Sequence, residues 1–286
     1  ENIVRLLLFE LLPICYLEGF KELKEISNKL PWPESPKFIF TSVNFSADEV
    51  FKIWTASKVE LGTKYYIGQH GNNYGTQKNF LPKVEELLTD KFITWGVKTR
   101  ANHVPAFIFK NAGKEINNYN SKGGLVLIET HQPHRYYTWD VASEHIEYFD
   151  DQKEFVKILD NDPKKRLIVR LHHANKLFKS NDKARWFDFD PLIKVDSGKT
   201  NINKLISKSR LVVHSYDSTG ILETLFINIP TLAFWQNGFD HLENNAKPFY
   251  QKLVDAGIIH LSAKSVSNKV NEIWSDVDSW WYQSNV

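Results

Sequence analysis

The residues best suited to bind a phosphate follow a buried, apolar run in residues 211–223, which read LVVHSYDSTGILE. The run predicts a strand, and the polar residues after it predict a turn that opens a helix. The first turn of a helix has free N–H groups and a positive dipole end, and Ser218 and Thr219 add hydroxyl donors beside Gly220. One turn further on, Glu223 could accept hydrogen bonds from a ribose. This pattern predicts a nucleotide-phosphate site; the alternative is that Ser218 or Thr219 only caps the helix and Glu223 faces solvent.

A basic cluster ends another predicted strand, in the run Arg170-Leu171-His172-His173. Arginine and histidine at such a position could bind a phosphate or a base. Because neighbouring side chains of a strand point to opposite faces, we expect only one of the two histidines to reach a given ligand. A histidine pair also suits a metal, but no further ligand stands at metal-binding spacing. We therefore expect no bound metal.

A glycine-containing loop follows a third predicted strand, in the run Gln69-His70-Gly71-Asn72-Asn73-Tyr74-Gly75. Glycine lets the backbone approach a ligand closely. We interpret Gln69, Gly71 and Tyr74 as candidates for holding a sugar or an acceptor. The alternative is an ordinary glycine turn.

A fourth candidate loop spans residues 130–140, which read THQPHRYYTWD. It gathers His134, Arg135, several aromatic rings and the carboxylate of Asp140. Such a loop could supply a catalytic carboxylate and a platform for a sugar. The alternative is a polar surface loop.

Short β-rich runs alternate with longer helical stretches, which is typical of α/β domains with parallel sheets and crossover helices. The polar stretch 117–124 predicts a linker. We expect two Rossmann-like domains, residues 1–120 and 121–286, with a cleft between them. Ligands of such sheets bind beyond the carboxyl ends of the strands, where all four candidate segments stand.

The predicted elements of the C-terminal domain recur regularly. Its strands are expected at 125–129, 167–171, 211–215, 231–235 and 258–261. Its helices are expected at 142–160, 201–208, 219–227, 243–256 and 264–280. The strands are continuous apolar runs, as in a sheet covered on both faces.

The N-terminal domain gives weaker signals. We expect a helix over 3–30, a helix from a capping box with Ser46 as N-cap to about Leu61, and strands at 38–41, 65–68, 92–95 and 106–109.

Composition excludes several classes of protein. The 286 residues are 42% hydrophobic and 24% charged with a formal charge of +2, which indicates a globular chain and gives no electrostatic case for nucleic-acid binding. Cys15 is the single cysteine, so no intramolecular disulfide is possible, which suits a reducing compartment. No Walker A, Gly-x-Ser-x-Gly or Gly-x-Gly-x-x-Gly motif is present. The lack of Met and the start within an apolar helical pattern predict a fragment of a longer protein from which methionines are missing.

The motifs resemble those of a family of bacterial transferases encoded in surface-polysaccharide (O-antigen and capsule) loci. The resemblance rests on the glycine loop at 69–75, on Ser218-Thr219 with the Leu-Glu-Thr-Leu run after it, on Asn228-Ile229-Pro230, and on Trp280-Trp281. It covers the chain from about Leu12 onward.

The resemblance implies a GT-B-like glycosyltransferase fold and a metal-independent reaction. The C-terminal domain of GT-B enzymes binds the nucleotide, which here implies Arg170, His172 or His173 and Ser218. Transferases of CMP-activated acidic sugars such as Kdo and sialic acid are similar in layout, but they carry His-Pro where this chain has His172-His173 or His173-Ala174. Asp140, by its position upstream of these histidines, is then the candidate nucleophile.

We therefore predict a glycosyltransferase that moves a sugar from a nucleotide sugar, CMP-Kdo or a related CMP-sugar, to a surface polysaccharide or lipopolysaccharide acceptor. Asp140 or Glu60 is the expected base or nucleophile, and His70 a further catalytic residue. No cofactor, metal or nucleic acid is expected. We expect a cytoplasmic location at the inner face of the membrane, with peripheral membrane association left open. A nucleotide-sugar 2-epimerase of the same architecture and a non-catalytic sugar-binding protein are the alternatives.

Overall fold

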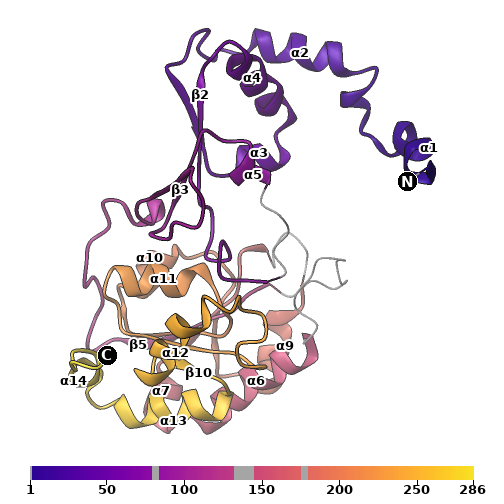
Figure 1. Ribbon diagram of the computed structural model, residues 1–286. Helices are drawn as coiled ribbons and strands as arrows, with labels where there is room; N and C mark the ends of the chain where they lie inside the picture. The colour runs from indigo at the N-terminus through magenta and orange to yellow at the C-terminus, as the bar shows by residue number, and fades with distance from the viewer. Residues whose placement is uncertain (1, 79–83, 132–144, 175–179) are drawn as a thin grey trace. The chain divides into compact units, whose positions relative to one another are not determined.

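The computed structural model describes residues 2–78, 84–131, 145–174 and 180–286 (Figure 1). The chain forms two compact units. Unit 1 comprises Glu1–Gly71 and Phe80–Phe107, and unit 2 comprises Asn72–Asn79 and Ile108–Val286.

The division differs from the predicted boundary at 120/121. Residues 108–120 belong to unit 2, where Asn111 Nδ2 donates to the carbonyl of Glu223 at 3.0 Å. Polar composition predicted a linker here, but backbone and side-chain hydrogen bonds over long sequence separations fix where a unit ends.

A short segment from the N-terminal half of the sequence also belongs to unit 2. Gln77 forms an antiparallel bridge with Leu242, and the N–H of Glu243 donates to the carbonyl of Thr76 at 2.7 Å. These contacts attach residues 72–78 to unit 2, although the strands on either side of them along the chain lie in unit 1.

Unit 1 is built on a four-stranded parallel sheet in the order β1-β2-β3-β4. Its strands are β1 (Phe38–Thr41), β2 (Lys64–Gly68), β3 (Lys91–Thr94) and β4 (His103–Pro105). Its helices are α1 (Asn2–Leu11), η1 (Ile14–Tyr16), α2 (Phe20–Lys29), α3 (Asn44–Ala47), α4 (Glu49–Glu60) and α5 (Val84–Leu87). Helix α4 packs against β2, and α2 packs against α4.

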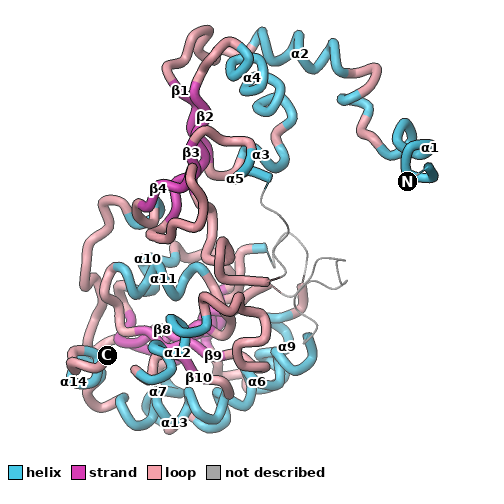
Figure 2. The backbone as a smooth tube through the Cα atoms, viewed as in Figure 1, coloured by secondary structure: helices cyan, strands magenta, loops and turns pink. Residues whose placement is uncertain are grey.

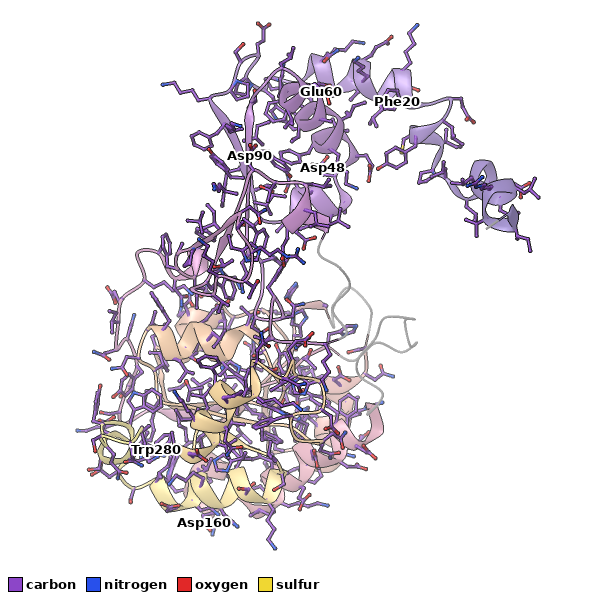
Figure 3. The ribbon with its side chains drawn as sticks, in the orientation of Figure 1. Phe20, Asp48, Glu60, Asp90, Asp160 and Trp280 are labelled. Atoms are coloured by element: carbon purple, nitrogen blue, oxygen red, sulfur yellow. The ribbon has the colours of Figure 1, made fainter. Side chains whose placement is uncertain are left out.

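The predicted helix over 3–30 is wrong, because it is interrupted between Leu11 and Phe20. Pro13 and Gly19 flank the short η1 there; proline has no N–H to give to a helix, and glycine weakens one. The predicted N-cap is also wrong. Asp48 rather than Ser46 caps α4, since its Oδ1 accepts from the N–H of Phe51 at 2.9 Å (Asp48 is labelled in Figure 3). The predicted strand at 106–109 is wrong as well: β4 precedes it, and η2 (Phe109–Asn111) begins within it.

Unit 2 contains a six-stranded parallel sheet in the order β10-β9-β8-β5-β6-β7. Its strands are β5 (Gly124–Ile128), β6 (Leu167–Arg170), β7 (Lys194–Asp196), β8 (Ser209–His214), β9 (Thr231–Phe234) and β10 (Ile259–His260). The predicted parallel α/β architecture of both halves is confirmed. Strand β7 was not predicted from the sequence, because it is short and carries charges at both ends.

The helices of unit 2 cover both faces of the sheet. They are η2, α6 (His145–Ile158), α7 (Asn161–Lys165), α9 (Asp182–Phe189), α10 (Ile202–Ile206), α11 (Thr219–Phe226), α12 (Lys247–Asp255), α13 (Ala263–Ile273) and α14 (Val277–Trp281). Figure 2 shows α10 and α11 on one face and α6 and α13 on the other. The predicted helix at 264–280 is two helices, because Asp276 caps α14 by accepting from the N–H of Ser279 at 3.0 Å.

The core of unit 2 lies between the sheet and these helices. The apolar side chains in the middle of β5, β8 and β9 are almost completely buried, and the rings of Phe155 and Phe234 stack with centroids 5.5 Å apart. The tryptophans near the C-terminus, Trp274, Trp280 and Trp281, are buried in the same core. Within the described residues, no helix is long and apolar enough to cross a membrane.

Replacing Leu127 by alanine tests the central position of β5. The side chain of Leu127 is completely buried, so Leu127→Ala is expected to lower the free energy of unfolding by about 2–5 kcal/mol. The matched control is Leu192→Ala, because Leu192 is 87% exposed and its loss should change stability by less than about 0.5 kcal/mol. Urea denaturation followed by circular dichroism measures both. Equal effects of the two substitutions would contradict the assigned core.

Candidate functional site

The strand order of unit 2 has a switch point between β5 and β8. From β5 the chain moves outward to β6 and β7, and from β8 it moves in the opposite direction to β9 and β10. Ligands of open parallel sheets bind beyond the carboxyl ends of the strands at such a point. Residues 129–131 follow β5 there, and residues 215–218 follow β8 and lead into α11.

Ser218 and Thr219 stand at the start of α11, as predicted from the sequence. Ser218 is the N-cap residue and is buried, but its Oγ lies 3.3 Å from Nδ1 of His214, and it makes no capping hydrogen bond to the first turn of α11. The hydroxyl of Thr219 accepts from the N–H of Asn72 at 3.2 Å. Gly220 packs directly on the imidazole of His214: a Cβ there would lie 2.7 Å from its Cε1. Glycine is therefore needed for this close approach.

His214, the last residue of β8, packs against this turn. Burial lowers its pKa to about 3, so the ring is neutral at ordinary pH. Its Nε2 lies 3.5 Å from the hydroxyl of Thr224. The ring thus positions Ser218 without adding charge to the site.

The loop after β5 contains a buried carboxyl group that the sequence analysis missed. Glu129 is 2% exposed and accepts a hydrogen bond from Nε1 of Trp186 at 3.1 Å. Burial, with a smaller contribution from the charge of Asp182, raises the pKa of Glu129 to about 8. The sequence feature that could have indicated this group is an acidic residue at the end of an apolar run.

The hydroxyl of Tyr148 joins the two loops at the switch point. It accepts from the N–H of Thr130 at 2.9 Å and lies 2.9 Å from Oγ of Ser215. Burial, and then the nearby Glu129, raises the pKa of this phenol well above its ordinary value. Tyr148 therefore stays neutral and holds the ends of β5 and β8 in register.

The basic cluster after β6 is differently arranged from the prediction. Arg170 forms an ion pair with Asp196 on neighbouring β7, so its guanidinium already has an anionic partner. The rings of His172 and His173 contact each other, tilted by 37° with centroids 4.2 Å apart, instead of pointing to opposite faces, because β6 ends at Arg170. Burial, followed by nearby positive groups, lowers the pKa of His172 to about 4.

Glu223 lies on the first turns of α11, with its side chain largely covered. Its carboxylate pairs with Nζ of Lys110 at 3.0 Å and lies 3.8 Å from Nζ of Lys114. The predicted hydrogen bond to a ribose would have to compete with these two lysines.

The remaining predicted residues are distributed over the two units. In unit 1, the side chain of buried Gln69 donates to the carbonyl of Gly71 at 2.8 Å and accepts from the N–H of Trp95 at 2.9 Å, which ties together the loops after β2 and β3. His70, in the loop after β2, is exposed, and Glu60, labelled in Figure 3, is exposed at the end of α4. Tyr74 is half-buried in the 72–78 segment of unit 2. The predicted residues Asp140, His134 and Arg135 lie outside the described residues.

Asp217 is the centre of a hydrogen-bond network that the sequence analysis did not identify. Its carboxylate accepts from Nδ2 of Asn72 at 3.0 Å and from the hydroxyl of Tyr250 at 3.1 Å. Nε2 of His241 lies 2.9 Å from its other oxygen. The four side chains come from three separate stretches of sequence, so no local motif indicated them. In the part of the chain that the structure describes, no three His, Cys, Asp or Glu side chains form a group that could hold a metal ion.

The raised pKa of Glu129 predicts a pH dependence of stability. The folded protein keeps this proton up to about pH 8, whereas the unfolded chain releases it near 4.5. The unfolded state therefore binds fewer protons between these values, and the free energy of unfolding should fall as the pH rises from 4.5 to 8. In Glu129→Gln, the part of this fall in the free energy of unfolding with pH that comes from Glu129 should disappear.

Urea denaturation across this pH range measures the effect. Glu154→Gln is the control, since Glu154 is exposed on α6 and its substitution should leave the slope of the wild type unchanged. An identical pH slope in wild type and Glu129→Gln would show that Glu129 is ionised in the folded protein.

Several solved structures are similar to this chain at low sequence identity. The wall teichoic acid polymerase TagF shares 11% identity with a TM-score of 0.46, over 77% of this chain and 61% of that chain. A complex of S. aureus MnaA with UDP shares 12% identity with a TM-score of 0.47, over 94% and 72%. The spinosyn rhamnosyltransferase SpnG, in complex with the spinosyn aglycone, shares 10% identity with a TM-score of 0.45, over 94% and 69%.

The chain thus spans less than two thirds of the length of the teichoic acid polymerase. No curated protein sequence matches it. A family model matches it over residues 1–286, and the chain accordingly belongs to the LIC12162 family of transferases.

Proposed function

We propose that this transferase moves a sugar from a nucleotide-sugar donor to a glycan acceptor. The observation that carries the proposal is the coincidence of two features in unit 2. The switch point between β5 and β8 is where open α/β sheets bind ligands, and the first turn of α11, with Ser218 and Thr219, begins there. Together with membership of a transferase family, this supports a site for the phosphate of an activated donor.

The first turn of α11 supplies the chemistry that glycosyl transfer requires. As the bond between the sugar and the phosphate breaks, negative charge develops on the leaving phosphate oxygen. Backbone N–H groups at a helix N-terminus, with the positive end of its dipole, stabilise such charge without a metal ion. The hydroxyl of Thr219, which donates to Oδ1 of Asn72 at 3.4 Å, adds a donor once that bond is exchanged for one to the phosphate.

The remaining roles follow the sequence-based prediction. Asp140 or Glu60 is the proposed base or nucleophile, with His70 as a further catalytic residue. The proposed contacts of sugar or acceptor are Gln69, Gly71, Tyr74, His134 and Arg135. The donor is proposed to be a CMP-sugar such as CMP-Kdo, and the acceptor a bacterial surface polysaccharide or lipopolysaccharide. The support for these finer assignments is the similarity in layout to CMP-sugar transferases, with His172 or His173 after β6 at the place of their His-Pro motif.

Nucleotide binding tests the proposal directly. A ligand that binds only the folded protein raises its melting temperature, so CMP, UMP, UDP, GDP and dTDP should be compared in thermal-shift experiments with and without EDTA. One nucleotide is expected to raise the melting temperature equally in both conditions. The double substitution Ser218→Ala/Thr219→Ala should remove that shift.

The matched control is Ser262→Ala. Ser262 is also an N-cap serine, but it begins α13 after the edge strand β10, away from the switch point. This substitution should lower stability slightly and leave the nucleotide shift intact. A flat nucleotide series with a response to free sugars would instead favour a sugar-binding protein. A shift that EDTA abolishes would contradict the metal-independent mechanism.

A further inference from the structure

The side chain of His241 belongs to the candidate site although no sequence motif pointed to it. It lies between β9 and α12, and β9 is paired with β8, with Ala233 opposite His214. The segment after β9 therefore begins at the same edge of the sheet as the turn that opens α11.

The imidazole of His241 is held in one orientation. Its Nε2 faces the carboxylate of Asp217 at 2.9 Å, and the ring of Trp235 stands perpendicular to it with centroids 5.9 Å apart. The backbone carbonyl of His241 accepts from the N–H of Lys78 at 3.0 Å. Because Nε2 is turned to the carboxylate, Nδ1 is the ring atom that can contact a ligand.

Asp217 orients the ring and is itself less exposed than the ring. Its side chain is 8% exposed, whereas that of His241 is 28% exposed. Asn72 and Tyr250 fix the carboxylate, and Asn72 also bonds to Thr219. An unbroken chain of hydrogen bonds thus runs from the hydroxyl proposed to bind phosphate, through Asn72 and Asp217, to the imidazole of His241.

Other basic groups at this edge are less suited to neutralise a phosphate. Burial keeps His214 and His172 neutral, and Arg170 is already paired with Asp196. His241 differs because its charged form would be paired with a carboxylate through Nε2 while its side chain stays 28% exposed. Asp217, from the turn after β8, and the ring of Trp235 contact the imidazole. Tyr250 of α12 bonds to the same carboxylate, and Nζ of Lys78 donates to the backbone carbonyl of Asp240, next to His241 in the chain.

We propose that His241 is a catalytic residue whose protonated imidazole donates a hydrogen bond from Nδ1 to the leaving phosphate of the donor. The inference rests on the proposed function. The bond between the anomeric carbon and the phosphate oxygen breaks, and its electron pair goes to that oxygen, where His241 stabilises the charge. The acceptor oxygen forms the new bond to the anomeric carbon, and its proton passes to the carboxylate base. Asp217 is a positioning residue that acts through His241.

Binding of the released nucleotide tests this contact apart from turnover. The affinities of wild type and His241→Gln for CMP, UMP, UDP, GDP and dTDP are measured by calorimetry between pH 5.5 and 8. The phosphate itself titrates near pH 6, and the ratio of the two affinities at each pH removes this contribution. We expect wild type to bind about tenfold or more tightly at low pH, as a charge-assisted hydrogen bond implies, and the ratio to approach one as the pH rises.

His260→Gln is the control, because His260 lies on the edge strand β10 and bonds locally to Ser265 and Gly257. Its nucleotide affinity should equal that of wild type at every pH. Asp217→Asn is the second variant, in case His241→Gln does not fold, and should reduce the pH dependence while retaining the imidazole.

The outcomes separate the two proposals. If wild type binds no nucleotide at any pH, the proposed function fails and this inference fails with it. If wild type binds but His241→Gln binds equally well throughout, only the role of His241 is overturned. In transfer assays, a fall of kcat by about 100-fold or more with KM nearly unchanged, confined to the acidic side of the pH profile, would support the contact. A loss confined to the alkaline side would overturn it, since His241 would then act as a base.

Discussion

The pairing of β5 with β8 is the constraint on which the candidate site depends. The two strands are separated by about eighty residues, yet they lie side by side because a sheet covered on both faces buries their apolar runs completely. Their onward connections leave in opposite directions, so the loops at their carboxyl ends diverge and leave the first turn of α11 between them. Tyr148 then fixes the two loops to each other through Thr130 and Ser215.

Burial at this edge decides which side chains carry charge. Desolvation disfavours the charged form of any group, so His214 is neutral and Glu129 keeps its proton into the neutral range. Charge survives where a partner of opposite sign is held in place, as it is for Arg170 on Asp196. Among the described basic groups near this edge, His214 and His172 are neutral and Arg170 is paired with Asp196, whereas His241 beside Asp217 keeps a partly exposed ring.

The segment 72–78 shows how far the candidate site departs from the order of the sequence. It follows β2 of unit 1, yet its hydrogen bonds run to Thr219, Asp217 and Glu243 of unit 2. Asn72 bonds to the hydroxyl of Thr219 and to the carboxylate of Asp217 at the start of α11. The hydroxyl of Thr219 is also proposed to bind phosphate, so donor binding would exchange its bond to Asn72 for a bond to the ligand.

The sequence by itself determined the parallel α/β class, most strands of unit 2, and the position of Ser218 and Thr219 at a helix start, because continuous apolar runs and turn residues are local signals. It did not determine the extent of the units, the ion pair that occupies Arg170, or the network around Asp217. These depend on contacts between segments far apart in the chain, and on burial, which shifts pKa values only after the chain has folded. The tertiary structure alone brought His241 to the carboxylate of Asp217, since sheet order rather than any motif makes them neighbours.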